Sequence, residues 1–419
     1  MTDGAPGPPS DAPRAAAGAP SRLPAALLVQ AARVIADGLR STCVEAGDDA
    51  SWATEGPRDD GANLYAGALG IALFLAAYAR VDGSAWARDL ALRAAAPARR
   101  AATQAGDSHE VAPGGLVGRG AQIYGLATLG RLLDEPALLT EAHRLATRIE
   151  ARWIEADRRL DVVHGSAGLI LALLSLGPAV AEPGPSRPTP LAQVRTASAH
   201  LVAMQQPPGA PWAGAVIGSS DALPQSGFAH GATGVGVALA RAGRALGDDA
   251  LFAAAARALA FERAHCAVAP GSWRMAPGES RTPIGWCRGA PGVALGRSTV
   301  LEASQGHMND ADDAQRELTE ALAFLQALPP MPLDHLCCGG MSVIDALLAL
   351  SRTDSAGALL AAAHARAVWI LRAARTRGHF VTGTEDADEP SLFQGLAGVG
   401  YGLLRLAAPE TLPCVSILA

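Results

Sequence analysis

The sequence predicts an all-α protein, folded as a closed, double-layered α/α barrel of seven inner and seven outer helices. Three observations point to this class. Only 4% of the 419 residues are aromatic, while alanine and leucine dominate, and this composition favours helices over sheet. A G-x-x-G step that opens an apolar, alanine-rich stretch recurs seven times along the chain, as in a repeat protein. More charged, amphipathic stretches lie between the repeats.

The glycine-led stretches are expected to be the inner helices, because they are apolar on most faces. The repeat interval of 48 to 66 residues holds two helices and two loops. Glycine at the start of each helix lets the backbone turn tightly and pack closely. The leading glycines of the seven repeats are Gly67, Gly115, Gly165, Gly231, Gly289, Gly339 and Gly395.

The outer helices are expected between the repeats, for example over residues 84–103 and 138–156. These stretches carry apolar residues at three- and four-residue spacing, the pattern of an amphipathic helix. An open solenoid is the alternative to a closed barrel. Closure is favoured because all the inner helices are nearly uncharged and therefore need to be buried.

The chain is expected to form one domain over residues 23–419, preceded by a disordered tail at 1–22 that is rich in proline, glycine and alanine. This tail lacks the apolar core of a signal peptide, so we expect a cytoplasmic protein. Residues 62–79 approach the roughly 20 apolar residues of a membrane span, but the repeat assigns them to an inner helix. We therefore expect no integral membrane segment. A net charge of −6 disfavours a nucleic-acid partner.

Three cysteines occupy matched positions just before the leading glycines of two neighbouring repeats. Cys287 precedes Gly289, and Cys337 and Cys338 precede Gly339. Barrel closure brings the starts of the inner helices, with their free N–H groups, to one rim. Three thiolates there would make a zinc site with an open fourth position, although a buried cysteine can also serve as a small hydrophobe. The remaining cysteines are expected to be structural: Cys43, Cys266 and Cys414.

Histidines and aspartates also stand at the predicted rim. His230 is a candidate general acid or base. Asp161 either orients a partner or caps its helix, whereas His164 is expected to cap or to pack. Arg288 either offsets an anionic site or faces solvent. Asp334 is a further carboxylate near the rim.

Five segments resemble, in the same order, the motifs of the lanthionine synthetase C-like cyclases. The resemblance spans about residues 23–419 and is closest to the C-terminal cyclase domain of class II lanthipeptide synthetases. It implies an α/α toroid with a single zinc ion. The segments read "DVVHGSAG", "SGFAHGATGVGVAL", "GWCRGAPGVALGR", "DHLCCGG" and "LFQGLAGVGYGLLRLAAPETLP".

The resemblance also implies roles for individual residues. The zinc ligands of the family match Cys287, Cys337 and Cys338. Cys338 stands in place of histidine, which resembles a subgroup with three cysteine ligands. The catalytic histidine and aspartate match His230 and Asp161. Arg281 lies near the place of an active-site arginine, without matching its spacing.

The activity implied by the resemblance is that of a zinc-dependent lanthipeptide cyclase. Such an enzyme adds peptide cysteine thiols to dehydroalanine or dehydrobutyrine and so forms thioether rings. The partners expected are a dehydrated precursor peptide and a separate dehydratase. One alternative is a catalytically inactive, zinc-containing toroid that binds peptides in a biosynthetic complex. Another is a different α/α-barrel enzyme, such as a prenyltransferase-like zinc protein or a glycosidase. A glycosidase needs paired carboxylates, and only Asp161 and Asp334 lie near the rim.

Overall fold

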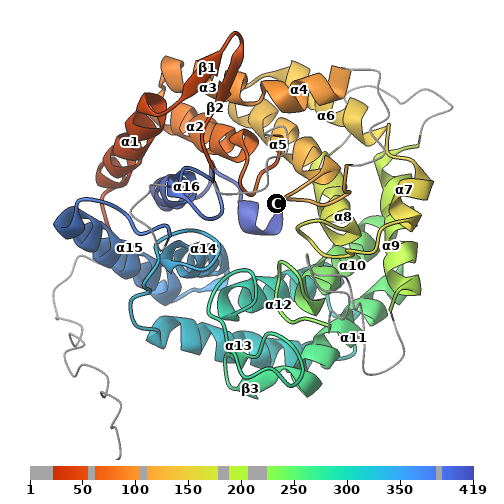
Figure 1. Ribbon diagram of the computed structural model, residues 1–419. Helices are drawn as coiled ribbons and strands as arrows, with labels where there is room; N and C mark the ends of the chain where they lie inside the picture. The colour runs from red at the N-terminus through yellow and green to blue at the C-terminus, as the bar shows by residue number, and fades with distance from the viewer. Residues whose placement is uncertain (1–21, 55–61, 104–110, 178–187, 206–223, 384–388) are drawn as a thin grey trace, which may run out of the picture.

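The computed structural model describes residues 22–54, 62–103, 111–177, 188–205, 224–383 and 389–419. The predicted disordered tail, residues 1–22, lies outside the described residues except for its last position. Within the described residues the chain forms two concentric layers of helices around a closed ring (Figure 1). The predicted all-α barrel is therefore confirmed, and no described helix is long and apolar enough to cross a membrane.

The inner layer contains one helix from each of the seven predicted repeats. These helices are buried on nearly all faces, as their apolar sequences require. In six of them the leading glycine predicted from the sequence is the N-cap residue. The inner helices are α2 (Ala68–Asp82), α5 (Arg119–Leu132), α8 (Ser166–Ser175), α10 (Ala232–Leu246), α12 (Ala290–Ser304), α14 (Gly340–Leu350) and α16 (Leu396–Ala407).

The second repeat differs from the prediction, because its helix begins after Gly118 and not after Gly115. Gly118 has a φ of 122°, which side-chain-bearing residues rarely adopt. A Cβ there would also lie 2.0 Å from the carbonyl oxygen of Ala112. The G-x-x-G pattern alone did not distinguish the two glycines, since both are spaced plausibly from an apolar run.

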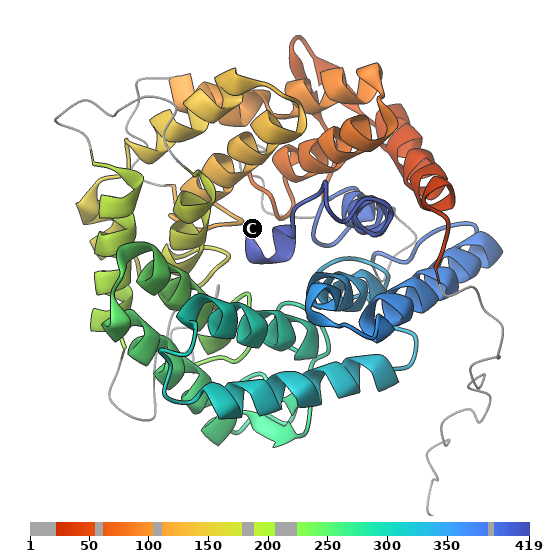
Figure 2. The same cartoon turned by 180° about the vertical axis from the view of Figure 1, so that it is seen from behind.

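The outer layer covers each inner helix with the segment that follows it in sequence. The exception is α16, which is covered by the first helix of the chain, α1; α16 also contacts α2, so the ring closes. Figure 2 shows the same two layers from behind. The outer helices are α1 (Ala25–Ser41), α3 (Ala85–Ala94), α4 (Ala96–Thr103), α6 (Pro136–Ala146), α7 (Ala151–Glu155), α9 (Pro190–Ala203), α11 (Asp249–His265), α13 (Ala311–Ala327) and α15 (Ala358–Arg377).

Two of the seven outer positions are divided into two helices. The predicted helix at 84–103 breaks at Ala95, two residues before Pro97. Proline has no N–H to continue the helical hydrogen bonds, which explains this break. The predicted helix at 138–156 breaks between α6 and α7, where the Gln193 side chain donates hydrogen bonds to the carbonyls of Ala146 and Ile149.

The remaining regular elements are small. Two antiparallel hairpins lie on the outside of the ring, and two 3-10 turns are present in the described residues. The elements are β1 (Val44–Ala46), β2 (Asp49–Ser51), β3 (Ala267–Ala269), β4 (Ser272–Trp273), η1 (Ser351–Thr353) and η2 (Val415–Ile417).

The turns that lead into the inner helices are joined by backbone hydrogen bonds in a closed ring. In each turn an amide donates to a carbonyl of the next turn, and the seventh turn donates back to the first. These bonds fix neighbouring turns at hydrogen-bonding distance, so their side chains share one rim. The bonds are Leu64 to Leu116 (2.9 Å), Leu116 to Val163 (3.2 Å), Val162 to Ala229 (3.1 Å), Ala229 to Cys287 (3.0 Å), Trp286 to Cys337 (2.7 Å), Cys337 to Phe393 (2.8 Å) and Phe393 to Tyr65 (3.2 Å).

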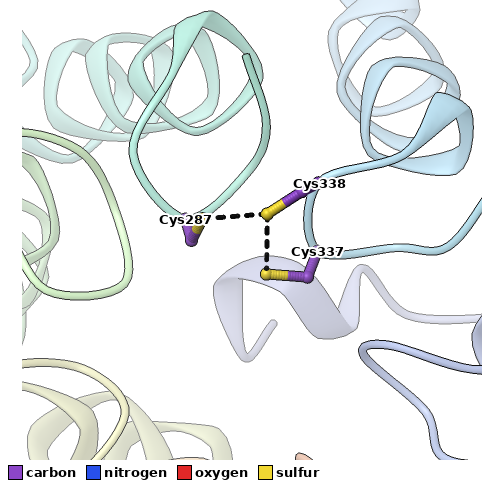
Figure 3. Close-up of side chains that lie close together, drawn as sticks. All are labelled: Cys287, Cys337 and Cys338. Carbon is purple, nitrogen blue, oxygen red and sulfur yellow. Dashed lines mark hydrogen bonds between the residues drawn. The ribbon is translucent and has the colours of Figure 1, made fainter. Parts of the chain in front are cut away.

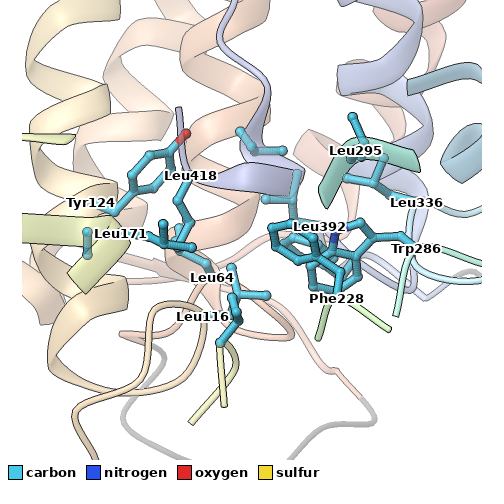
Figure 4. Close-up of a cluster of buried hydrophobic side chains, with 14 of the residues drawn as sticks. Leu64, Leu116, Tyr124, Leu171, Phe228, Trp286, Leu295, Leu336, Leu392 and Leu418 are labelled. Carbon is cyan, nitrogen blue, oxygen red and sulfur yellow. The ribbon is translucent and has the colours of Figure 1, made fainter. Parts of the chain in front are cut away.

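The centre of the ring is filled by the C-terminal segment, whose end lies at the middle of both views (Figures 1 and 2). The indole of Trp286 donates to the carbonyl of Ser416 at 2.8 Å, and the hydroxyl of Tyr401 donates to the carbonyl of Pro413 at 2.9 Å. Leu418 is buried beside Tyr124 among the central apolar side chains (Figure 4). The barrel therefore has a packed centre beneath its rim.

Candidate functional site

The three cysteines predicted to bind zinc meet at the rim. Cys287 lies in the turn before α12, and Cys337 and Cys338 lie in the turn before α14. The sulfur of Cys338 lies 3.2 Å from that of Cys287 and 3.4 Å from that of Cys337 (Figure 3). The bond from the Trp286 amide to the Cys337 carbonyl holds the two turns together.

This arrangement fits a zinc ion. All three sulfur atoms lie within 4.8 Å of one another. Zn–S bonds of about 2.3 Å place sulfur atoms in a tetrahedral site roughly 3.8 Å apart, so the sulfurs need to separate by only a few tenths of an ångström. The set supplies three ligands, which leaves one tetrahedral position for another molecule.

Electrostatics distinguish the three thiols. Hydrogen bonds from Cys337 and Cys338 hold the pKa of Cys287 well below its usual value, with the positive charge of Arg288 helping, although burial opposes the change. The hydrogen bond with Cys287 raises the pKa of Cys338 to about 12. Cys287 is therefore the thiol of the cluster that loses its proton most readily.

The predicted acid–base pair is also assembled. Nδ1 of His230, in the turn before α10, lies 2.7 Å from Oδ2 of Asp161, in the turn before α8. Oδ1 of Asp161 accepts the backbone amides of His164 and Gly165 at 2.6 and 3.1 Å. Asp161 therefore combines the two roles expected for it: Oδ1 caps the turn, and Oδ2 orients His230.

A second imidazole lies on the same carboxylate. Nδ1 of His164 is 3.8 Å from Oδ2 of Asp161, and the rings of His164 and His230 stack at 6.0 Å between centroids. Burial alone would raise the pKa of Asp161, but the two imidazoles beside the carboxylate hold it well below its usual range. These three residues could also ligate a metal, but zinc prefers the sulfur set in a structure that offers one.

The two groups are neighbours on the ring, since the Ala229 amide donates to the Cys287 carbonyl at 3.0 Å and His230 follows Ala229. Arg288 extends from the turn of Cys287, where its guanidinium donates to the Met275 sulfur at 3.0 Å. The positive charge of Arg288 helps to lower the pKa of Cys287, and its role at the site stays a prediction.

Other predicted rim residues have different positions. Arg281 has an exposed side chain, 71% accessible, that pairs with Glu279 at 3.7 Å, and its catalytic role stays a prediction. Asp334 is buried and accepts hydrogen bonds from Arg377 and the Val381 amide. It is therefore engaged in holding the neighbouring loop and is not a free carboxylate of the rim.

Tyr65 is a site residue that the sequence analysis did not identify. Its hydroxyl donates to the sulfur of Cys337 at 3.3 Å, and burial raises its pKa well above the usual value. One signal was present in the sequence. Tyr65 stands two residues before Gly67, just as Cys287 and Cys337 stand two residues before their own leading glycines.

Comparison with known proteins shows one family. A family model described as "Lanthionine synthetase C-like protein" matches residues 58–418. Among solved structures, nisin cyclase is similar with a TM-score of 0.67 and 15% identity, over 93% of this chain and 96% of that chain. No curated protein matches the sequence.

A GH76 α-mannanase from Bacteroides thetaiotaomicron has a similar fold, with a TM-score of 0.51 and 11% identity, over 92% of this chain and 96% of that chain. At these identities both structures show that the fold is shared. The helical toroid is thus common to proteins with different activities, and the chemistry must be argued from the site itself.

Proposed function

Because the chain belongs to the lanthionine synthetase C-like family, as the match over residues 58–418 shows, we propose that it is a zinc-dependent lanthipeptide cyclase. The proposed reaction is the intramolecular addition of peptide cysteine thiols to dehydroalanine or dehydrobutyrine, which forms lanthionine or methyllanthionine rings. The observation that carries this proposal is the convergence of Cys287, Cys337 and Cys338 beside the Asp161–His230 pair.

The proposed ligands of a single zinc ion are Cys287, Cys337 and Cys338. When bound, zinc would lower the pKa of a substrate thiol, so that the reactive thiolate exists at neutral pH. With zinc bound, the site would keep a net negative charge, because three thiolates carry three negative charges and the zinc ion carries two positive charges. Arg288, whose charge acts on Cys287, would offset part of that excess.

The proposed proton donor is His230. The thiol loses its proton, its sulfur bonds to the β-carbon, and the α-carbon of the resulting enolate takes up a proton. Since Nδ1 of His230 faces Asp161 at 2.7 Å, Nε2 is the nitrogen left to exchange a proton with the substrate. Asp161 stabilises the positive charge of the imidazolium and fixes the orientation of its ring.

The proposed substrate is a dehydrated precursor peptide, and a dehydratase must act first because the reaction consumes dehydroamino acids. We propose a dehydratase on a separate chain and a cytoplasmic location. Support for this compartment comes from the six cysteines, all of which are free thiols, as is usual in reducing compartments.

The test is to incubate the purified chain with a dehydrated, cysteine-containing peptide and to count the free thiols. We expect thiol loss that requires zinc and that fails in Cys287→Ala, which should also lose stoichiometric zinc. Cys43→Ser is the matched control, because Cys43 lies outside the cluster. Zinc and peptide binding without thiol loss would instead support the inactive peptide-binding toroid. Equal thiol loss without the protein would contradict catalysis.

A further inference from the structure

Tyr65 reaches the cysteine cluster from a turn far away in sequence. It lies in the turn before α2, 272 residues from Cys337, yet its hydroxyl donates to the Cys337 sulfur at 3.3 Å. An O–H group that points at a metal-binding sulfur stabilises negative charge on that atom. This contact exists only because the ring closes between the seventh and first repeats.

The position of the Tyr65 ring is held from two sides. The phenol stacks on Phe393, with centroids 5.3 Å apart and an interplanar angle of 8°. The Phe393 amide donates to the Tyr65 carbonyl at 3.2 Å, and the Cys337 amide donates to the Phe393 carbonyl at 2.8 Å. Tyr65, Phe393 and Cys337 therefore lie in three neighbouring turns of the ring, joined by backbone hydrogen bonds. The stacked phenol is thereby held beside the Cys337 sulfur.

We propose that Tyr65 is a positioning residue of the metal centre, which orients Cys337 and withdraws charge from its thiolate by hydrogen bonding. This inference rests on the proposed role of the cysteines as zinc ligands. A third thiolate adds a negative charge that a neutral imidazole ligand would not bring. A hydrogen-bond donor to one of the thiolates disperses that charge, as partners of metal ligands commonly do.

The variant that tests this is Tyr65→Phe in the full chain, because it removes one hydroxyl and keeps the ring that stacks on Phe393. The matched control is Tyr401→Phe. Tyr401 is a buried tyrosine of α16, and its hydroxyl donates to the Pro413 carbonyl at 2.9 Å. Circular dichroism of both metal-free variants checks that each is folded as the unaltered chain is.

Two readouts other than turnover are measured: zinc affinity by competition with a chelator, and the thiolate-to-metal charge-transfer absorption of the Co²⁺-loaded protein. We expect Tyr65→Phe to bind zinc about 10-fold more weakly, at the lower end of the effect of such partners. Its charge-transfer band should move to longer wavelength, since the Cys337 thiolate becomes richer in electrons. Tyr401→Phe should match the unaltered chain in both readouts.

Two results would overturn the inference in distinguishable ways. If Tyr65→Phe equals Tyr401→Phe in affinity and spectrum, the cysteines bind metal but Tyr65 does not position them. If the unaltered chain shows no thiolate-to-cobalt absorption, the proposed zinc centre itself fails, and the role of Tyr65 fails with it.

Discussion

Nδ1 of His230 lies 2.7 Å from Oδ2 of Asp161, although 69 residues separate them in the chain. The two turns that carry them are joined by the hydrogen bond from the Val162 amide to the Ala229 carbonyl. The backbone of the ring therefore holds the His230 and Asp161 side chains in contact before any substrate binds.

Replacing Asp161 with asparagine should slow cyclisation by about 100-fold, the lower end of typical acid–base contributions. Asparagine can still accept the amides of His164 and Gly165 through its oxygen, but its NH₂ group would then face His230. The measurement is the rate of thiol loss from a dehydrated peptide by the zinc-loaded variant.

The control for Asp161→Asn is Asp157→Asn. Asp157 lies in the same segment, but its carboxylate accepts hydrogen bonds from three backbone amides and from the Ser166 hydroxyl, and none from a histidine side chain. This control should lower the melting temperature and leave the rate per folded molecule unchanged. If both variants lose activity equally, Asp161 acts through the fold and not through His230.

Arg288→Ala should reduce cyclisation more than Arg281→Ala. The Arg288 charge lowers the pKa of Cys287, whereas Arg281 is exposed and pairs with Glu279. We expect a loss of roughly 10-fold for Arg288→Ala, the effect of about 1.4 kcal/mol at the barrier. A larger loss for Arg281→Ala would instead support the arginine role inferred from the family resemblance.

Gly168→Ala should destabilise the protein by about 3 kcal/mol, the upper end of the usual cost of overpacking. A Cβ at this position of α8 would lie 1.9 Å from the Val162 carbonyl and 2.3 Å from the Gly115 amide, and backbone atoms cannot rotate away. Urea denaturation measures the change in the free energy of unfolding.

Gly38→Ala is the matched control for Gly168→Ala, since nothing lies within 4 Å of a Cβ built at Gly38 in α1. Alanine has a higher helix propensity than glycine, so this variant should be more stable by up to about 1 kcal/mol. Equal changes in the free energy of unfolding for the two variants would contradict the prediction that the backbone around Gly168 leaves no room for a Cβ.

Acidification should loosen the contact between the first helix and α15. Nδ1 of His364, a buried residue of α15, accepts the Leu23 amide just before α1 at 3.1 Å. Burial lowers the pKa of His364 from its ordinary 6.5, so the unfolded chain takes up this proton more readily than the folded one. The stability that neutral His364 provides is therefore present above about pH 6.5 and is lost as the pH falls below it.

Urea denaturation at several pH values between about 5 and 8 measures this effect. The unaltered chain should lose stability on acidification more steeply than His364→Gln, in which the group does not titrate. His265→Gln, at an exposed histidine of α11, should keep the slope of the unaltered chain. Parallel curves for the unaltered chain and His364→Gln would contradict the prediction.

Much of the architecture was predictable from local sequence. A glycine before each apolar stretch marks a helix start, because a side chain there would collide with the backbone: a Cβ at Gly165 would lie 2.3 Å from the Leu160 amide nitrogen. Seven such stretches predicted seven inner helices. The prediction was wrong where local sequence was ambiguous, as between Gly115 and Gly118, and where Pro97 interrupts an amphipathic run.

The candidate site was predictable to the extent that its residues occupy repeated positions. Cys287 and Cys337 stand at matched places before their glycines, and the resemblance to a known family named the acid–base pair. Tyr65 was missed because a tyrosine in an apolar stretch does not by itself indicate a metal or catalytic site. Its contact with the Cys337 sulfur depends on which turns are neighbours after closure.

The sequence by itself determined that this protein would be two layers of helices with sulfur and imidazole groups near the starts of the inner helices, since repeat period, apolar pattern and glycine positions are local properties. Only the tertiary structure decided which of those groups touch. The closed set of hydrogen bonds between the seven turns places His230 on Asp161 and Tyr65 on Cys337. These contacts join residues tens to hundreds of positions apart, and such distances are set by closure of the ring and not by any stretch of sequence.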